Sequence, residues 1–347
     1  RIGYFEAFGK RDPGADDAMR LDSIFRIFSM TKPIVSIAIM QLVEQGRILL
    51  ADPLSKYIPA FAETKVGVVR DGELALVAPD RAITIQDLLR HTSGLTYDFV
   101  GEHPVQKLYA KANLARPDQT NADQAAALAR LPLLNQPGAA WDYSRSTDVL
   151  GRIVEIVTGK PLGAALDAQV LEPLGMKDTA FSAPEKKFDR IAEPLAVDPD
   201  TGQPVKLFNA KRAATFESGG GGLVSTALDY ARFCAMLAGE GTFGKERIIG
   251  RKTLELMRSD HLGDHVRRGS DLLPPGHGFG LGFAVRTAPG MAVMPGSPGA
   301  FYWGGIAGTT FWIDPREKLF ALMMIQAPGQ RDYYRMLFRT LAYAAIE

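Results

Sequence analysis

Cysteine is almost absent from this chain of 347 residues, and that scarcity excludes two kinds of cross-link. Cys234 is the single cysteine, so the chain forms no internal disulfide and no cysteine-based zinc site. Long hydrophobic runs are lacking too, because the longest has only about ten residues, too few to cross a bilayer. We therefore expect a globular chain with no membrane span, in which Cys234 is a small core residue.

A large excess of charge of either sign is also lacking. The 40 basic and 39 acidic residues leave a net charge of +1, which excludes a strong electrostatic attraction to nucleic acid or to an anionic membrane. The expected partner is a small molecule, and the oligomeric state is left open. The chain starts at Arg1 rather than at methionine and shows no basic-then-apolar leader. We expect a cytoplasmic rather than a periplasmic location, and loss of an N-terminal segment is left open.

Three familiar catalytic or ligand-binding patterns are missing or incomplete. No serine lies in Gly-x-Ser-x-Gly, which excludes the nucleophile elbow of the α/β-hydrolases. His261 and His265 flank Gly263 without a further ligand motif, which predicts a surface turn rather than a metal centre. The segment 239–245 resembles a phosphate loop, but Glu246 replaces the serine or threonine that would bind magnesium. We expect neither a metal nor a cofactor.

Sequence patterns typical of strands stand near both ends of the chain, with helical patterns between them. Strands are predicted at residues 2–8, 278–286, 301–303, 309–313 and 319–325, and a final helix at 331–346. The economical arrangement is an α+β fold with one antiparallel sheet, built from both termini and flanked by the first and last helices. Residues 1–53 and 205–347 would form this sheet domain, and residues 54–204 an inserted, mainly helical subdomain. A site is expected in the cleft between them.

The most informative stretch is Ser29-Met30-Thr31-Lys32, where an extended segment gives way to an apolar helical run. A serine and a lysine three residues apart at a helix start lie on one face, with Cβ atoms about 5–6 Å apart. That geometry lets an amine draw the proton from a hydroxyl and so activate it as a nucleophile. The helix is apolar nearly all round, which predicts burial, partial desolvation of Lys32 and a preference for its neutral form. The spacing alone is weak evidence, since a chain of this length contains about one S-x-x-K by chance.

Two further segments add to this signal. Tyr143 follows the turn at residues 136–138 and stands on a loop just before a helix. Trp303-Gly304-Gly305 runs along a predicted strand, where the glycines would let a ligand approach the backbone. Taken singly, a tyrosine is usually a packing residue and a glycine pair in a strand is usually a bulge. Only their joint occurrence with the serine and the lysine indicates a catalytic site.

In this order and at these separations, the three elements resemble the serine β-lactamase and penicillin-binding-protein superfamily, with its S-x-x-K, Y-x-N and K-T-G motifs. The likeness is closer to the class C-like carboxylesterases called family VIII esterases, and it covers nearly the whole chain. Other supporting stretches are residues 25–32, 91–95, 137–150, 219–226 and 278–283. The resemblance implies a β-lactamase-like fold, which agrees with the split-sheet layout above.

The resemblance also implies roles for individual residues. Ser29 would be the nucleophile and Lys32 the amine that activates it. Tyr143 would be the partner base and then the proton donor to the leaving group, and which of Lys32 and Tyr143 takes the first proton is left open. The backbone N–H groups of Ser29 and Ile306 would hold the oxyanion.

Two positions depart from the family pattern and bear on the substrate. Trp303 replaces the lysine of K-T-G, which helps bind the β-lactam carboxylate, and Arg145 replaces the asparagine of Y-x-N. Trp303 offers a flat apolar wall without a cation, which favours uncharged, hydrophobic acyl or alcohol groups. The direction of the Arg145 side chain is left open. The expected substrate-binding residues are Trp303, Gly304, Gly305, Tyr97 and Arg145.

These observations predict a cofactor-free serine hydrolase that cleaves short-chain carboxylic esters through an acyl-enzyme on Ser29. A β-lactamase, or an acyltransferase that passes the acyl group to an alcohol, is the alternative within the same fold. A β-lactam-like substrate and a β-lactamase side activity are therefore left open. The non-enzymatic alternative is a penicillin-binding sensor that is acylated once and stalls. Lys32 and Tyr143 argue against it, because both would also serve deacylation.

Overall fold

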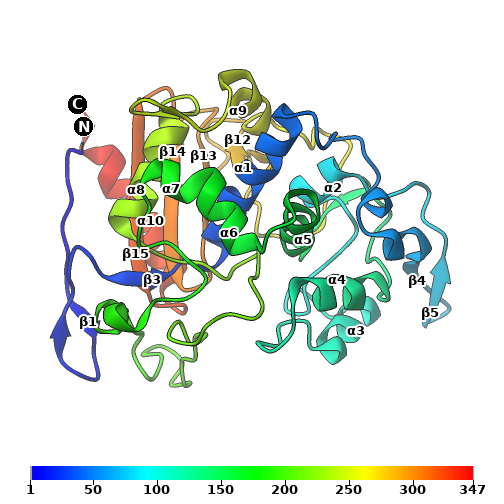
Figure 1. Cartoon of the computed structure of the whole chain (residues 1–347), viewed down its shortest axis with the longest axis horizontal. Helices are drawn as coiled ribbons and strands as arrows, with labels where there is room; N and C mark the ends of the chain where they lie inside the picture. The colour runs from blue at the N-terminus through cyan, green and yellow to red at the C-terminus, as the bar shows by residue number, and fades with distance from the viewer. Residues whose placement is uncertain (1, 347) are drawn as a thin grey trace.

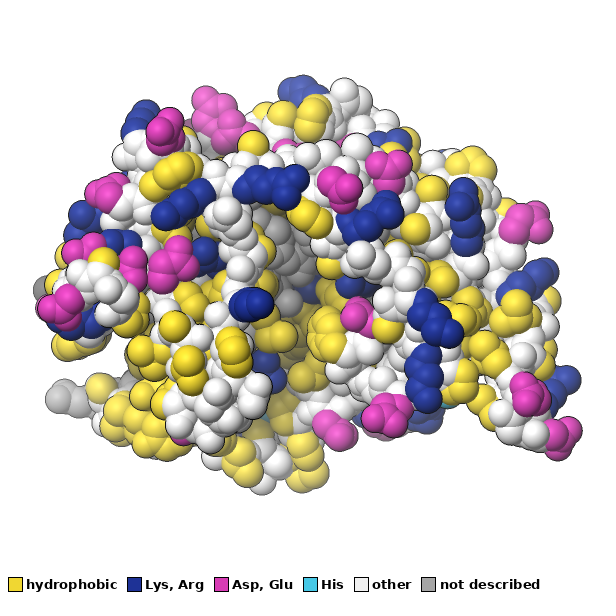
Figure 2. Space-filling view, turned by 90° about the horizontal axis from the view of Figure 1, so that it is seen from below, with side chains coloured by type: hydrophobic (Ala, Val, Ile, Leu, Met, Phe, Trp, Pro, Cys, Tyr) yellow, Lys and Arg dark blue, Asp and Glu magenta, His cyan; other side chains and the backbone are white. Residues whose placement is uncertain are grey.

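The computed structural model describes residues 2–346 and shows a sheet-containing part and a mainly helical part side by side (Figure 1). The sheet is drawn in orange and red, and the long helix α1 (Thr31–Glu44) stands in blue between the two parts. Seen from below, the molecule is hollowed near its middle, and hydrophobic side chains gather along the lower part of the hollow (Figure 2). The combination of one main antiparallel sheet with separate helices confirms the α+β class.

The main sheet is a five-stranded antiparallel meander from the C-terminal third of the chain. Its order is β11-β12-β13-β14-β15, so neighbours in sequence are neighbours in space. The expected strand at 278–286 is divided into β11 and β12, which pair with each other through a tight turn. The bounds are β11 His277–Phe279, β12 Ala284–Arg286, β13 Phe301–Gly304, β14 Gly308–Asp314 and β15 Leu319–Gln326.

Helices cover both faces of this sheet. Phe311 and Trp312 are successive residues of β14, so their side chains point to opposite faces. Phe311 packs against Tyr230 of α8 (Ala227–Ala238), with ring centroids 5.2 Å apart. Trp312 packs against Phe338 of α10 (Arg331–Ala344) at 5.3 Å. The sheet is therefore the middle of three layers, as the prediction of a last helix on the sheet requires.

The N-terminal segment contributes to the sheet region in a different way from the one expected. Residues 2–8 do not form a strand, so that prediction was wrong; the first strands are β1 (Lys10–Asp12) and β2 (Asp17–Ala18), which pair with each other. Next, β3 (Ile24–Arg26) pairs with β7 (Val224–Thr226). The side chain of Gln326 at the end of β15 both donates to and accepts from the backbone of Arg26, at 3.2 Å each. A glutamine side chain thus joins β3 to the sheet edge in place of a backbone ladder.

Helix α1 is buried along nearly its whole length, as its apolar sequence predicts. It contacts α5 (Ser146–Thr158), a helix of the mainly helical part. Helix α5 ends at its C-cap Gly159, which takes the left-handed conformation with φ of +70°. Helix α1, buried in this way, is a rigid support for the residues at its first turn.

The other elements complete the helical part and the connections. The helices are α2 Ile85–Leu89, α3 Pro104–Ala112, α4 Asn121–Ala129, α6 Leu162–Leu166, α7 Glu172–Leu174 and α9 Arg251–Met257, with a π-helical turn at Asp167–Leu171 and 3-10 turns at Phe28–Met30, Leu54–Lys56, Pro59–Glu63 and Glu185–Arg190. The remaining strands pair as β4 Val66–Arg70 with β5 Glu73–Val77, β6 Ala140–Trp141 with β10 Arg267–Arg268, and β8 Thr242–Phe243 with β9 Glu246–Arg247. The exact division at residues 54 and 204 stays a prediction. Among the described residues, no helix has the length and apolar character needed to cross a bilayer.

Candidate active site

Ser29 lies on the 3-10 turn Phe28–Met30, which connects β3 to α1. The side chain is partly exposed, so a substrate can reach it. The preceding Phe28 has a φ of +43°, a left-handed conformation that a bulky side chain seldom adopts. Such backbone strain is concentrated at functional sites, where the surrounding structure holds it in place. The turn thus places the hydroxyl at the open end of a buried helix.

Lys32 is almost fully buried, at 2% exposed, and its ammonium group contacts three oxygen atoms. Its Nζ lies 3.2 Å from Ser29 Oγ, 3.1 Å from the Tyr97 hydroxyl and 2.6 Å from the carbonyl oxygen of Gly220. A lysine ammonium has three N–H donors and no acceptor, so these three contacts match its full capacity. The geometry fixes the amine beside the serine.

The protonation state of Lys32 differs from the expected neutral form. Burial lowers its pKa, but the facing phenol groups of Tyr143 and Tyr97 and the carboxylate of Asp148 outweigh burial and raise the pKa above its ordinary value. The sequence correctly predicted burial but could not show the acceptors that stabilise the charge. Lys32 is therefore a cation at neutral pH, and a cation holds its proton.

Tyr143 stands on the loop between β6 and α5 and is buried at the side of Lys32. The Lys32 Nζ lies 4.5 Å from the centroid of the Tyr143 ring. The indole Nε1 of Trp303 donates a hydrogen bond to the Tyr143 hydroxyl oxygen, at 3.2 Å. The ring of His91 packs on Tyr143 at 4.9 Å, and burial, followed by the charge of Lys32, lowers the pKa of His91 well below its ordinary value. A neutral histidine, an indole and an ammonium thus enclose the phenol.

The Trp303-Gly304-Gly305 segment ends β13 and turns toward Ser29. A Cβ atom on Gly305 would lie 2.4 Å from the carbonyl oxygen of Ile27, so the turn packs directly on the segment before the serine. Ile306 follows at the tip and is 43% exposed. Within residues 2–346, no group accepts a hydrogen bond from its amide. Trp303 itself is 7% exposed, so most of its indole packs on neighbouring rings rather than forming an open wall.

The Arg145 side chain, whose direction the sequence left open, is turned into the protein. Its Nη2 donates to Asp98 Oδ1 at 3.3 Å, and its Nη1 lies 3.8 Å from Asp148 Oδ2. The guanidinium stands 5.0 Å from the centroid of the Tyr97 ring. Two carboxylates and an aromatic face therefore engage the charge of Arg145, and the expected role in substrate binding stays a prediction.

Several residues around the site carried no functional signal in the sequence. Asp148 accepts a hydrogen bond from the backbone N–H of Gly220 at 2.9 Å, and the carbonyl of the same Gly220 accepts from Lys32. Tyr97 was predicted as a substrate contact, but its hydroxyl is a partner of Lys32. Gly220 lies in residues 219–226, which support the family resemblance without assigning a role to any single residue. Its contact with Lys32 joins residues 188 positions apart, which no local pattern shows.

Asp142, next to Tyr143, gives a testable pH dependence. Burial raises its pKa to about 6, although hydrogen bonds from Asn135 and Thr96 act in the opposite direction. Because this carboxyl pKa is raised in the folded state, the protonated group stabilises the fold fully below pH about 4. That contribution to the free energy of unfolding, at most about 3 kcal/mol, is lost as the pH rises to about 6. In Asp142→Asn we expect this loss to disappear. Unfolding free energies in urea at pH 4, 5, 6 and 7 measure it as the difference from wild type; parallel curves would contradict it.

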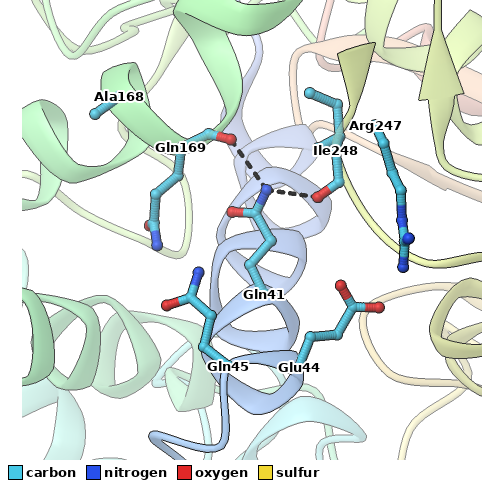
Figure 3. Close-up of a pocket in the computed structure, with 7 residues that line it drawn as sticks. All are labelled: Gln41, Glu44, Gln45, Ala168, Gln169, Arg247 and Ile248. Carbon is cyan, nitrogen blue, oxygen red and sulfur yellow. Dashed lines mark hydrogen bonds between the residues drawn. The ribbon is translucent and has the colours of Figure 1, made fainter.

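The depression shown in Figure 3 contains none of Ser29, Lys32 and Tyr143 among its lining residues. Its lining residues are Gln41, Glu44, Gln45, Ala168, Gln169, Arg247 and Ile248. The Gln41 side-chain amide donates to the carbonyl oxygens of Gln169 and Ile248, at 3.0 and 2.7 Å. These bonds join the far end of α1 to two neighbouring segments, which is a structural role. Within the part of the chain that the structure describes, no cluster of three metal-ligating side chains occurs.

Comparison with known proteins gives matches over nearly the whole length. A family model described as beta-lactamase matches residues 1–345. Esterase EstB from Burkholderia gladioli is 33% identical over 341 residues, which cover 93% of this chain and 82% of EstB. Protein Rv1367c of Mycobacterium tuberculosis is 39% identical over 92% of this chain and 81% of its own length. The solved structure of EstCE1, a hydrolase with promiscuous acyltransferase activity, superposes with a TM-score of 0.82 at 30% identity and covers 98% of this chain and 90% of EstCE1.

Proposed function

Because this chain belongs to the beta-lactamase family and has its fold, we propose that it is a serine hydrolase that cleaves short-chain carboxylic esters through an acyl-enzyme on Ser29. The esterase relatives support a hydrolase of this fold. The proposed acyl-enzyme on Ser29 rests on the contact of 3.2 Å between Lys32 Nζ and Ser29 Oγ, beside the buried phenol of Tyr143.

In the proposed mechanism, Ser29 Oγ attacks the ester carbonyl carbon and forms a C–O bond, while the carbonyl electron pair moves onto oxygen. Lys32 is already a cation, so in this scheme the serine proton passes to the phenolate oxygen of Tyr143, beside the Lys32 ammonium. The N–H groups of Ser29 and Ile306 would hold the oxyanion, as paired donors do in acyl transfer. When the intermediate collapses, the bond to the alcohol breaks and Tyr143 returns the proton to the leaving oxygen.

Deacylation repeats these steps with water in place of the alcohol. Water transfers a proton to Tyr143 as it attacks the acyl carbon, and Ser29 Oγ recovers a proton when it leaves. Lys32 and Tyr143 thus serve both halves of the reaction, which supports turnover rather than a stalled acyl adduct. No step needs a metal or an organic cofactor.

An ester is favoured over a β-lactam by the two departures from the family motifs. Trp303 supplies an N–H to Tyr143 where the family pattern has a lysine, and the charge of Arg145 is engaged by Asp98 and Asp148. Neither of these two motif positions therefore offers a free cation to a substrate carboxylate. Uncharged acyl groups fit such a site better, because a buried charge needs a partner.

Acyl transfer to an alcohol is the second candidate, and the similarity to EstCE1, a hydrolase with promiscuous acyltransferase activity, favours it. One experiment separates the possibilities: the purified protein is given p-nitrophenyl butyrate, nitrocefin, and p-nitrophenyl butyrate with added 1-butanol. We expect ester hydrolysis to be much faster than nitrocefin hydrolysis. Butyl butyrate in the third mixture would show acyl transfer. Faster nitrocefin turnover, or an acyl adduct that persists in mass spectra after a single turnover, would overturn the proposal.

A further inference from the structure

Arg335, on the C-terminal helix α10, reaches the turn that follows Trp303-Gly304-Gly305. Its Nη2 donates hydrogen bonds to the carbonyl oxygen of Gly305 and to that of Thr309, the latter at 3.0 Å. The Gly305 carbonyl also accepts from the backbone N–H of Gly308, at 3.0 Å. One charged and one neutral donor therefore fix the direction of this carbonyl.

The Gly305 carbonyl and the Ile306 N–H belong to the same peptide group. Resonance couples the two ends of a peptide, so a donor on the oxygen increases the positive partial charge on the amide hydrogen. A cationic donor has a stronger effect than a neutral one. The N–H of Ile306, which has no acceptor within residues 2–346, is thus the far end of a peptide that a partly buried guanidinium polarises.

We propose that Arg335 is a positioning residue for the oxyanion site, which orients and polarises the Gly305–Ile306 peptide so that the Ile306 N–H binds the developing negative charge more strongly. This inference rests on the proposed function, because the oxyanion forms only if Ser29 attacks an acyl carbon. It adds a residue from outside all three family motifs, on the helix that covers one face of the sheet.

Packing and charge support this assignment. A Cβ atom on Gly304 would lie 2.6 Å from Arg335 Nη2, so glycine at this position lets the guanidinium approach the turn. Burial lowers the pKa of Arg335 to about 10, while Asp332, 3.8 Å from Nη1, acts in the opposite direction. Arg335 is therefore still cationic at neutral pH. Its Nε has no hydrogen-bond partner in the described residues, so the interaction with the turn is the main one that the side chain makes.

Arg335→Met tests the proposal through the acyl carbonyl itself. Wild type and variant are reacted with p-nitrophenyl N,N-dimethylcarbamate carrying a ¹³C carbonyl, which leaves a slowly hydrolysed carbamoyl group on Ser29. A weaker oxyanion donor moves the carbonyl stretching band to higher wavenumber, and we expect this shift in Arg335→Met. For p-nitrophenyl butyrate we expect kcat to fall about tenfold with KM within about twofold, since a weakened donor loses part of the effect of a deleted one.

Arg339→Met is the matched control, because Arg339 is a buried arginine one turn further along α10. Its Nε donates to the carbonyl of Pro295 at 2.9 Å, away from the turn. We expect Arg339→Met to lower the melting temperature and leave the carbonyl band in place. If Arg335→Met does not fold, Arg335→Gln, which keeps a neutral donor, is measured in its place and should also raise the band.

A band at the wild-type position in the folded Arg335 variant would overturn this inference and assign Arg335 a structural role like that of Arg339. Ser29→Ala separates that result from failure of the proposed function. If Ser29→Ala still releases p-nitrophenol and takes up the carbamoyl label, the nucleophile is wrong and both proposals fall. If Ser29→Ala is inert and the Arg335 band does not move, only the inference about Arg335 fails.

Discussion

Ser29→Ala is expected to abolish hydrolysis of p-nitrophenyl butyrate, with a loss in kcat of at least about 10⁴-fold. The hydroxyl is the only group that the proposed mechanism uses as nucleophile. Within residues 2–346, no other serine hydroxyl forms a hydrogen bond with Lys32 Nζ. The residual rate should equal the rate that binding and the oxyanion donors give to direct attack by water. Initial rates over a substrate series measure it.

Ser36→Ala is the matched control for this experiment. Ser36 lies on the same helix α1, is 1% exposed and takes no part in the proposed chemistry. Both variants remove one hydroxyl group, so a loss of activity in Ser29→Ala alone assigns the effect to chemistry rather than to helix stability. Melting curves should show both proteins folded. Turnover in Ser29→Ala within tenfold of wild type would refute the acyl-enzyme assignment.

The local features of the fold were predictable because neighbouring residues determine them. Thr84 accepts from the Asp87 backbone and closes a capping box at the start of α2, as the sequence indicates. The strands near 301–325 follow from apolar runs between turns, and α8 begins at Ala227, directly after its N-cap Thr226. The predicted strand at residues 2–8 was wrong because strand formation depends on more than the local sequence. An apolar run becomes a strand only where a partner strand is available, and the structure gives this segment none.

The candidate site was predictable only where the family motifs mark it. Lys32 and Ser29 are neighbours in sequence, so their contact follows from helix geometry. The contact of Lys32 with Tyr97 joins positions 65 residues apart, and that of Arg335 with Gly305 joins positions 30 apart on different elements. These contacts set the charge of Lys32 and orient the turn, and both depend on the packed fold. Sequence therefore indicates the candidate reacting groups, and tertiary structure determines the contacts around them.

The two phenols beside Lys32 make a sharper experiment than the lysine itself. In Tyr143→Phe we expect kcat to fall by about 10³-fold, because the variant loses the group proposed to carry the proton in both half-reactions. In Tyr97→Phe we expect less than a tenfold loss. Burial raises the pKa of Tyr97 to about 12, although the charge of Lys32 opposes this, so its phenol stays protonated at neutral pH and only accepts a hydrogen bond from the lysine.

The two variants control for each other, since each removes one hydroxyl from a buried ring next to the same ammonium. Both should weaken the interactions around Lys32, at 4.5 Å and 5.4 Å from the two ring centroids. A shared structural effect would lower both activities and both melting temperatures together. A difference of a hundredfold or more in kcat, at similar melting temperatures, has no such explanation and assigns proton transfer to one phenol. If Tyr97→Phe loses more activity than Tyr143→Phe, the roles of the two tyrosines are exchanged. If neither variant loses more than tenfold in kcat, neither phenol carries the proton. Lys32 must then do so, which its raised pKa opposes.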